Sequence, residues 1–174
     1  MNFWMKFLMK ILKTAIKLSY ERFIPNPYQR RYHFAIAFDG NKPFCLSQNN
    51  PIKVNAKAFR MGQKFNIQTY KEFPYAHAES HLISQLLDRY NSIDPNWTIV
   101  VVRIGRDGRM RLSKPCENCA KILSAVGLND VYWSVGDNHF EDSDNSQITI
   151  DSDYFFRYAK GRFYSKNKPC SPVV

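Results

Sequence analysis

Four side chains in two short stretches of the sequence have the types and the spacing of a metal site with an acid–base group. His77 and Glu79 are two residues apart, and Cys116 and Cys119 are three residues apart and follow a proline. Two thiolates and one imidazole suit Zn²⁺, and three protein ligands leave one position for water. Zinc lowers the pKa of a bound water from about 15.7 to about 7, so hydroxide becomes available for hydrolysis.

The spacing of these residues predicts that each motif begins a helix. Residues three apart share one face of a helix, and the partial positive charge at a helix N-terminus favours thiolates. Pro115 suits the start of such a helix, because the first turn needs no donor from it. Residues two apart diverge by roughly 200° in mid-helix, so His77 and Glu79 must lie in a frayed first turn to act together.

Periodicity and turn signals predict the elements that position the two motifs. Helices with one apolar face are expected at 76–90 and 116–126. Strands are expected at 33–38, 43–46, 98–102, 131–135 and 147–150. An Asp-Gly turn joins the first two strands, and the third reads as buried on both faces. Residues 47–74 show no clear period, and 137–146 reads as an acidic loop.

The last strand is expected to run antiparallel to the strand before it. Parallel strands need a crossover of a dozen or more residues, usually a helix, and 137–146 is too short and has no helical period.

The composition predicts one ordinary globular domain with its own core. The chain has 174 residues, of which 44% are hydrophobic and 15% aromatic, so global disorder is excluded. No run of eighteen apolar residues exists, which excludes a conventional membrane-spanning helix. Four unevenly placed cysteines are too few for a disulfide framework, and this usage fits a reducing compartment. We therefore expect a cytoplasmic protein.

The two motifs together match the H-x-E…P-C-x-x-C signature of zinc deaminases. From about residue 33 to 150 the chain resembles the cytidine-deaminase-like superfamily, in which the same order of hairpin, helices and strands occurs. The runs NPIKVNAKAF, YAHAES, VVVRIGRDGRMRLSKPCENC and GLNDVYWS are most similar to small deaminases of phages and bacteria. The resemblance implies a three-layer α/β/α sandwich around a mixed sheet of about five strands.

The resemblance also implies the roles of the four residues. His77, Cys116 and Cys119 are expected to bind Zn²⁺, and Glu79 is expected to shuttle protons between the zinc-bound water and the base. Hydroxide then attacks C4 of a cytosine ring, Glu79 protonates N3 and the leaving amine, and the uracil form and ammonia result. Adenine deamination at C6 uses the same chemistry, so the motif does not decide the base.

Four further residues are candidates for substrate contact: Asn55, Ala78, Tyr75 and Ser113. The first is the best match to an Asn that holds the sugar in many relatives, with Asn49 and Asn50 as competitors. The backbone of Ala78 is expected near the exocyclic amine, and Tyr75 beside the pocket wall. Ser113 is a candidate helix cap or site residue.

Alternative roles remain for three other side chains. His81 follows His77 by four residues and could add a metal ligand, although a packing role is the simpler interpretation. Trp133 is a candidate to stack on a base, and Phe140, in the acidic loop, is a candidate to close over one.

The net charge of +10 comes from the two ends of the chain. This uneven distribution suggests that the chain has three parts. Residues 1–31, an amphipathic helix and linker, hold seven Lys and Arg and one acid. Residues 157–174, a C-terminal tail, hold five Lys and Arg and no acid, which leaves the deaminase domain at 32–156 with a charge of −1. The N-terminal helix packs on the sheet of the domain, lies on a membrane surface, or contacts a partner.

The expected function is deamination of a free cytosine nucleoside or nucleotide, because a nearly neutral body suits a small substrate. By the resemblance, members acting on free nucleosides often have the antiparallel last strand, whereas RNA- and DNA-editing members insert a helix and have a parallel one. A deaminase of single-stranded DNA or RNA is the alternative, supported by basic ends and many aromatics. A deaminase-like binding scaffold without activity is a third. Weak nucleic-acid contact through the basic ends and association into homo-oligomers both stay open.

Overall fold

The computed structural model of the chain describes residues 1–72 and 74–150. Its helices are α1 (Phe3–Arg22), α2 (Ala56–Phe65), α3 (Gln68–Glu72), α4 (Ala78–Tyr90) and α5 (Glu117–Ala125). Its strands are β1 (Arg31–Asp39), β2 (Lys42–Gln48), β3 (Asn50–Val54), β4 (Tyr75–Ala76), β5 (Thr98–Gly105), β6 (Met110–Arg111), β7 (Val131–Gly136), β8 (His139–Asp142) and β9 (Gln147–Thr149).

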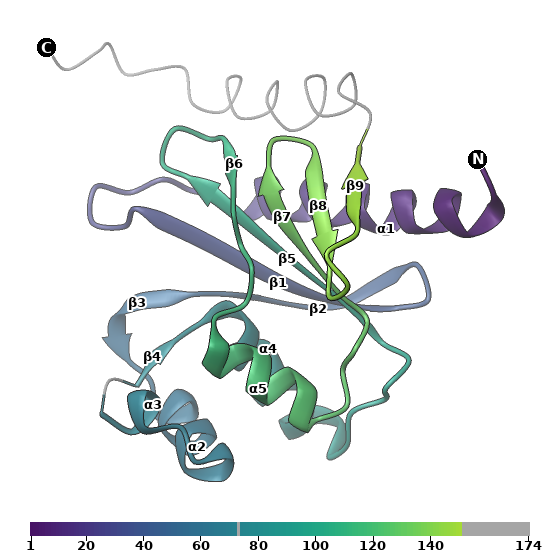
Figure 1. Cartoon of the computed structure of the whole chain (residues 1–174). Coiled ribbons are helices and arrows are strands. Elements are labelled where there is room, and N and C mark those ends of the chain that lie inside the picture. The colour runs from purple at the N-terminus through teal and green to yellow at the C-terminus, as the bar shows by residue number, and fades with distance from the viewer. Residues whose placement is uncertain (73, 151–174) are drawn as a thin grey trace, which may run out of the picture.

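These elements form the three layers that the sequence predicts. Helix α1 covers one face of a mixed sheet, and α4 and α5 cover the other (Figure 1). The order of the sheet is β2-β1-β5-β7-β8-β9, and the short β6 pairs with the end of β5. Strand β1 runs antiparallel to β2 and β5, whereas β5 and β7 are parallel. The α/β/α sandwich is therefore confirmed.

Side chains that alternate along the central strands form two separate cores. On β1, Phe34 and Ile36 face α1, whereas Ala35 and Ala37 face the layer of α4 and α5. Strand β5 does the same and is buried on both sides from Thr98 to Val102, as predicted from its continuous apolar run. This alternation fixes the register, because a shift of one residue would exchange the two faces.

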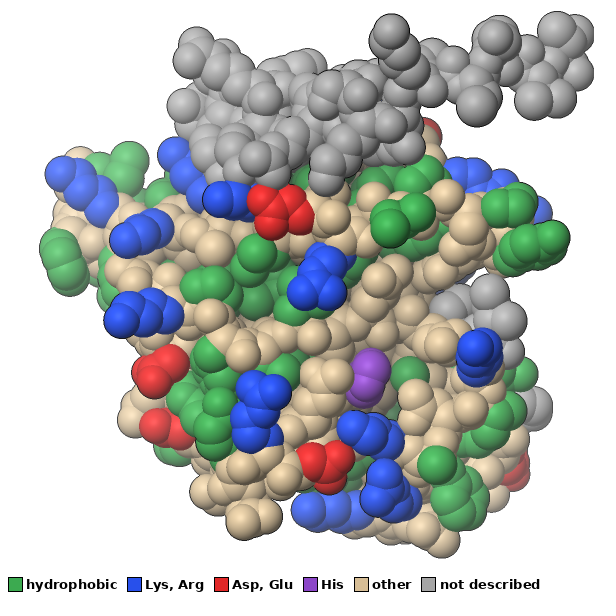
Figure 2. Space-filling model, turned by 180° about the vertical axis from the view of Figure 1, so that it is seen from behind, with side chains coloured by type: hydrophobic (Ala, Val, Ile, Leu, Met, Phe, Trp, Pro, Cys, Tyr) green, Lys and Arg blue, Asp and Glu red, His purple; other side chains and the backbone are tan. Residues whose placement is uncertain are grey.

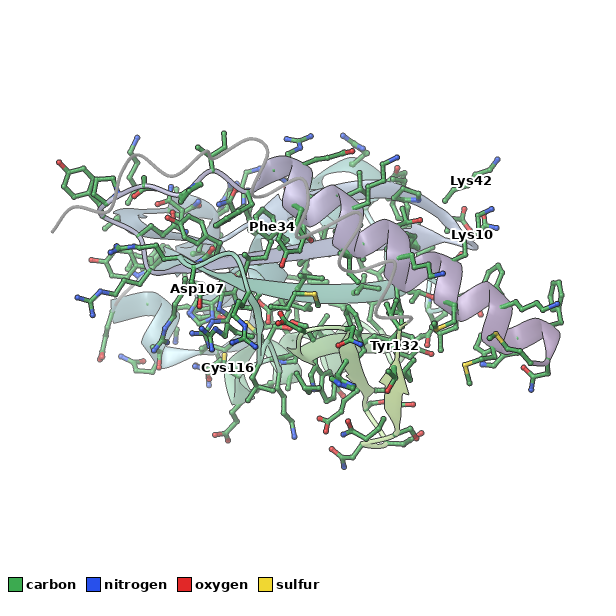
Figure 3. The ribbon with its side chains drawn as sticks, turned by 90° about the horizontal axis from the view of Figure 1, so that it is seen from above. Lys10, Phe34, Lys42, Asp107, Cys116 and Tyr132 are labelled. Carbon is green, nitrogen blue, oxygen red and sulfur yellow. The ribbon has the colours of Figure 1, made fainter. Side chains whose placement is uncertain are left out.

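Helix α1 belongs to the core of the domain. Its apolar residues facing the sheet are buried: Leu8, Ile11, Leu12, Ala15 and Ile16. Lys6 and Lys10 on the opposite side are exposed. Seen from above in Figure 3, the helix lies across the strands of the sheet. Packing on the domain's own sheet, the first of the three expectations for this helix, is confirmed.

Two segments differ from the expectations. Residues 139–142 form β8 inside the expected acidic loop, after a turn in which Asn138 has a φ of +54°. No helix lies between β7 and β9, as expected, but the strand that runs antiparallel to β7 is β8 and not the expected last strand at 147–150. Strand β9 pairs with β8 and not with β7. The segment 47–74 is also more regular than expected, since it contains β3, α2 and α3.

The expected basic tail at 157–174 lies outside the described residues. Within the described part of the chain, no helix combines the length and the apolar character needed to cross a membrane.

Candidate metal centre

Both motifs lie at the start of a helix, as the sequence predicts. His77 is the N-cap of α4, with extended backbone (φ −76°, ψ 153°), and Cys116 is the N-cap of α5. The backbone N–H of Cys119 donates to Sγ of Cys116 over 3.4 Å, so the sulfur takes the capping role that a Ser or Asp oxygen usually has. The starts of the two helices thereby bring His77 close to Cys116 and Cys119.

His77, Cys116 and Cys119 form one cluster with the geometry of a metal site. Nδ1 of His77 lies 3.6 Å from Sγ of Cys116 and 3.5 Å from Sγ of Cys119, and all ligand atoms lie within 4.8 Å of one another. Tetrahedral zinc with bonds of about 2.3 Å to sulfur and 2.0–2.1 Å to nitrogen would separate N and S by about 3.6 Å. The three residues therefore fit a metal ion such as zinc.

In the metal-free protein, hydrogen bonds within the cluster favour a thiolate on Cys116 and a proton on His77. Hydrogen bonding from Cys119 lowers the pKa of the Cys116 thiol to about 3, and His77 lowers it further, against the effect of burial. Hydrogen bonding to Cys116 and burial raise the pKa of Cys119, and hydrogen bonding to Cys116 raises that of His77. Cys116 is thus the thiolate, the form that binds metal, and a metal ion would displace the protons of the other two.

Glu79 places a buried carboxyl group beside this cluster. It is the second residue of α4, and only 4% of its surface is exposed. Burial raises its pKa to about 7, with a smaller opposing effect of the His77 charge and a reinforcing effect of Cys116. A carboxyl that titrates near neutrality can both accept and donate a proton at physiological pH.

Tyr70 of α3 supports the ligands and was not found from the sequence. Its hydroxyl lies 2.8 Å from Sγ of Cys119, and its ring packs edge-on against that of His77 with centroids 5.3 Å apart. Partners of this kind orient metal ligands. The segment that carries Tyr70 shows no period in the sequence, so only the packing of α3 reveals the contact.

A cavity of about 490 Å³ opens beside the cluster, within the size range of small-molecule sites. Its described lining residues are Arg31, His33, Asn49, Tyr75, Ala76, His77, Ala78, Glu79, Arg103, Leu112, Lys114 and Cys116. The structure therefore brings the candidates Tyr75 and Ala78 together with the metal cluster and Glu79. Ala78 is fully buried, and Tyr75 is 36% exposed at the edge of the cavity.

Two other candidates lie outside this cavity lining. Asn55 is the N-cap of α2, and its side-chain oxygen accepts from the N–H of Lys57 over 2.8 Å. Ser113 is 1% exposed, and its hydroxyl donates to the carbonyl of Val101 over 2.8 Å and also contacts Ser134. In this structure Asn55 caps a helix, and Ser113 joins β5 to β7.

Asn49, the competitor of Asn55, does line the cavity, but its side chain is engaged with the strands. Its oxygen accepts from the backbone N–H of His33 over 2.9 Å, and its amide donates to the carbonyl of Arg31 over 3.2 Å. Asn49 thereby holds the beginning of β1 in place at the edge of the site.

Burial and contacts show where the three other candidate side chains, Phe140, Trp133 and His81, lie. Phe140 is fully buried in the core under α1, on the face of the sheet away from the metal cluster, so the idea that it closes over a base is wrong. Trp133 is buried on the face of α5. The ring of His81 lies near the carbonyl of Gln48 and the amide of Gln85, outside the metal cluster, which fits packing.

Comparisons with protein-family models, with curated proteins and with solved structures found no match to this chain. The features that bear on function are therefore the metal cluster, the buried carboxyl and the cavity.

Proposed function

We propose that this protein is a zinc-dependent deaminase that converts a free cytosine nucleoside or nucleotide to its uracil form and releases ammonia. The observation that carries the proposal is the placement of Glu79, a buried carboxyl with a pKa of about 7, beside a His-Cys-Cys cluster of tetrahedral spacing that adjoins a cavity.

The residues of the site would divide the work between them. His77, Cys116 and Cys119 would hold the zinc ion, which would supply an acidified water as nucleophile. Glu79 accepts the proton from the nucleophile and returns protons to N3 and to the departing amine of the base. The backbone of Ala78, between the ligand and the acid in sequence, lines the cavity and would lie near the exocyclic amine of the base.

Two features support a small substrate over a polynucleotide. Residues 32–156 carry a net charge of only −1, which favours a small substrate over a long phosphate backbone. No helix lies between β7 and the strands that follow it, whereas by the resemblance RNA- and DNA-editing members insert a helix there.

The experiment that tests the proposal is ammonia release from a substrate panel. Zinc-loaded protein is mixed with dCMP, cytidine, deoxycytidine, adenosine and cytosine-containing single-stranded DNA, and Glu79→Gln is the matched control. Turnover of a free cytosine compound by the wild type and not by the control is expected. Zinc binding without turnover of any member would favour a binding scaffold, and absence of zinc binding would remove the proposal.

A deaminase of single-stranded nucleic acid is the second candidate, favoured by the exposed N-terminal part of α1. Phe3 is 84% exposed and Trp4 56% exposed, and Lys6 and Lys10 are exposed beside them. Aromatic rings and cations are the groups that bind single strands. On the face shown in Figure 2, several Lys and Arg side chains lie close together below the histidine, and others lie apart from them. Preference for the DNA member of the panel would select this candidate.

A further inference from the structure

The cavity beside the metal centre is lined by three cations: Arg31, Arg103 and Lys114. Glu79 is the acid among its described lining residues, and it lies buried at the floor beside the metal ligands. Arg31 and Lys114 are exposed, and Arg103 is half-buried. The cavity therefore has the carboxyl group of Glu79 and the metal ligands on one side. The three cations form what we call its cationic rim.

The register of the central strands places two of these cations side by side. His33 of β1 and Arg103 of β5 are direct partners in the antiparallel ladder, and Arg31 lies two residues before His33. Alternate residues share one face, so these side chains continue the face that Ala35 and Val101 present to α4 and α5. Two of the three rim cations are thus held by the central strands β1 and β5.

The three cations have no acidic partner within the described residues. The salt bridges there join other pairs: Lys57–Asp88, Arg109–Asp137 and Arg111–Asp107. Arg103 donates from Nη1 to the carbonyl of Leu112 over 3.3 Å, but its buried Nε has no hydrogen-bond partner. Lys114 lies over the ring of Trp133, 5.6 Å from its centroid.

Holding Arg103 in this position is unfavourable without an anion. Burial lowers its pKa, and the neighbouring charges of Arg31 and Arg111 lower it further. A buried donor without a partner is also costly. An anion at the rim would offset the repulsion between the arginines.

We propose that Arg31, Arg103 and Lys114 bind the phosphate group of the substrate, so that the protein acts on a cytosine nucleoside monophosphate in preference to the nucleoside. This inference rests on the proposed function of the same site. The guanidinium group presents paired N–H donors that match phosphate oxygens, and lysine adds a point charge. With the base held at Ala78 and Glu79, the phosphate lies at the rim.

The first test compares kcat/KM for cytidine or deoxycytidine with that for its 5′-monophosphate. The wild type should prefer the monophosphate by at least about tenfold, which corresponds to about 1.4 kcal/mol of binding. Arg103→Gln and, separately, the exposed Arg31→Gln should each reduce that preference about tenfold or more. Arg30→Gln, an exposed neighbour outside the cavity lining, is the matched control and should keep it. Equal kcat/KM for both substrates in the wild type would overturn the inference.

The second test measures binding without turnover, so that it separates this inference from the proposed function. Calorimetry on full-length Glu79→Gln should give at least tenfold tighter binding of cytidine monophosphate than of cytidine, with the difference lost on adding Arg31→Gln. That result would preserve the phosphate site even if no substrate were deaminated. Turnover of nucleosides without tighter monophosphate binding would overturn the phosphate site and preserve the function.

Salt dependence decides between one phosphate and many. The affinity of a protein for a single strand falls as the salt concentration rises, with a log–log slope of about −0.7 for each phosphate contact. One bound phosphate therefore gives a shallow slope. Tighter binding of single-stranded DNA than of the mononucleotide, with a slope steeper than about −2, would overturn the inference in favour of a polynucleotide substrate.

Discussion

Glu79 and the cysteines should give opposite results when they are replaced. Glu79→Gln is expected to retain about one zinc per chain and to lose about 10²–10⁴-fold in kcat, because the carboxyl moves protons but is not a ligand. Cys116→Ala should instead lose zinc, because it removes one of three protein ligands. Zinc content and ammonia release on the same preparations measure both. Loss of zinc from Glu79→Gln would contradict its assigned role.

His33 should make the stability of the metal-free protein sensitive to mild acid. Burial, with the charges of Arg103, His77 and Arg31, lowers its pKa to about 4, below the 6.5 of the unfolded chain. The unfolded state therefore binds the proton first, and stability present above about pH 6.5 is lost as pH falls toward 4. The free energy of unfolding should fall by up to about 1.4 kcal/mol per pH unit from this group.

Urea unfolding of metal-free wild type and His33→Gln between pH 4 and 7 tests this effect. The variant should show a flatter pH dependence than the wild type. His139→Gln, which replaces an exposed histidine, is the matched control. Identical pH profiles for wild type and His33→Gln would show that His33 is protonated alike in the folded and unfolded states.

At the scale of elements, the close packing of α2 and α3 holds Tyr70 against the metal ligands. A Cβ atom added at Gly62 of α2 would lie 2.8 Å from Cβ of Tyr70 and 3.0 Å from its carbonyl carbon. These atoms belong to the backbone of α3 or are bonded directly to it. Helix α3 must therefore shift if a larger residue replaces Gly62. Gly62 is therefore the residue that allows α3 to reach the metal centre.

Gly62→Ala should destabilise the protein by about 1–3 kcal/mol, although alanine is the better helix former. It should also weaken zinc binding, because Tyr70 would move away from Cys119. Chemical denaturation and zinc titration measure the two effects. Gln63→Ala, at an exposed position of the same helix, should leave both close to wild type. A stabilised Gly62→Ala protein with unchanged zinc affinity would contradict this account.

For the whole molecule, a metal ion should join α4 and α5 and stabilise the fold. A ligand that binds only the folded state adds about 2.7 kcal/mol at 100 times its Kd, or roughly 5–10 °C in Tm for a chain of this size. Zinc should raise the Tm of the wild type, and a chelator should reverse the rise. Cys119→Ala should not respond. Cys45→Ala, at a half-buried thiol outside the cluster, should respond like the wild type.

The sequence by itself determined the features that follow from local rules. The i, i+3 spacing of Cys116 and Cys119, the preceding proline, and the short His77–Glu79 interval predict two helix starts, and both are N-caps in the structure. The continuous apolar run of β5 and the Asp-Gly turn at Gly40, whose φ is +58°, likewise predict a central strand and a hairpin. Each signal is contained in a few neighbouring residues.

Only the tertiary structure decided which distant residues surround the metal centre. Arg31 and Arg103 are separated by about seventy positions in the chain, and strand register alone brings them to one cavity. Tyr70 reaches Cys119 because α3 packs on α2 in a segment without periodicity. The choice of Asn49 over Asn55 as a cavity residue depends on how β2 ends beside β1. Such contacts arise from long-range pairing, which no local pattern encodes.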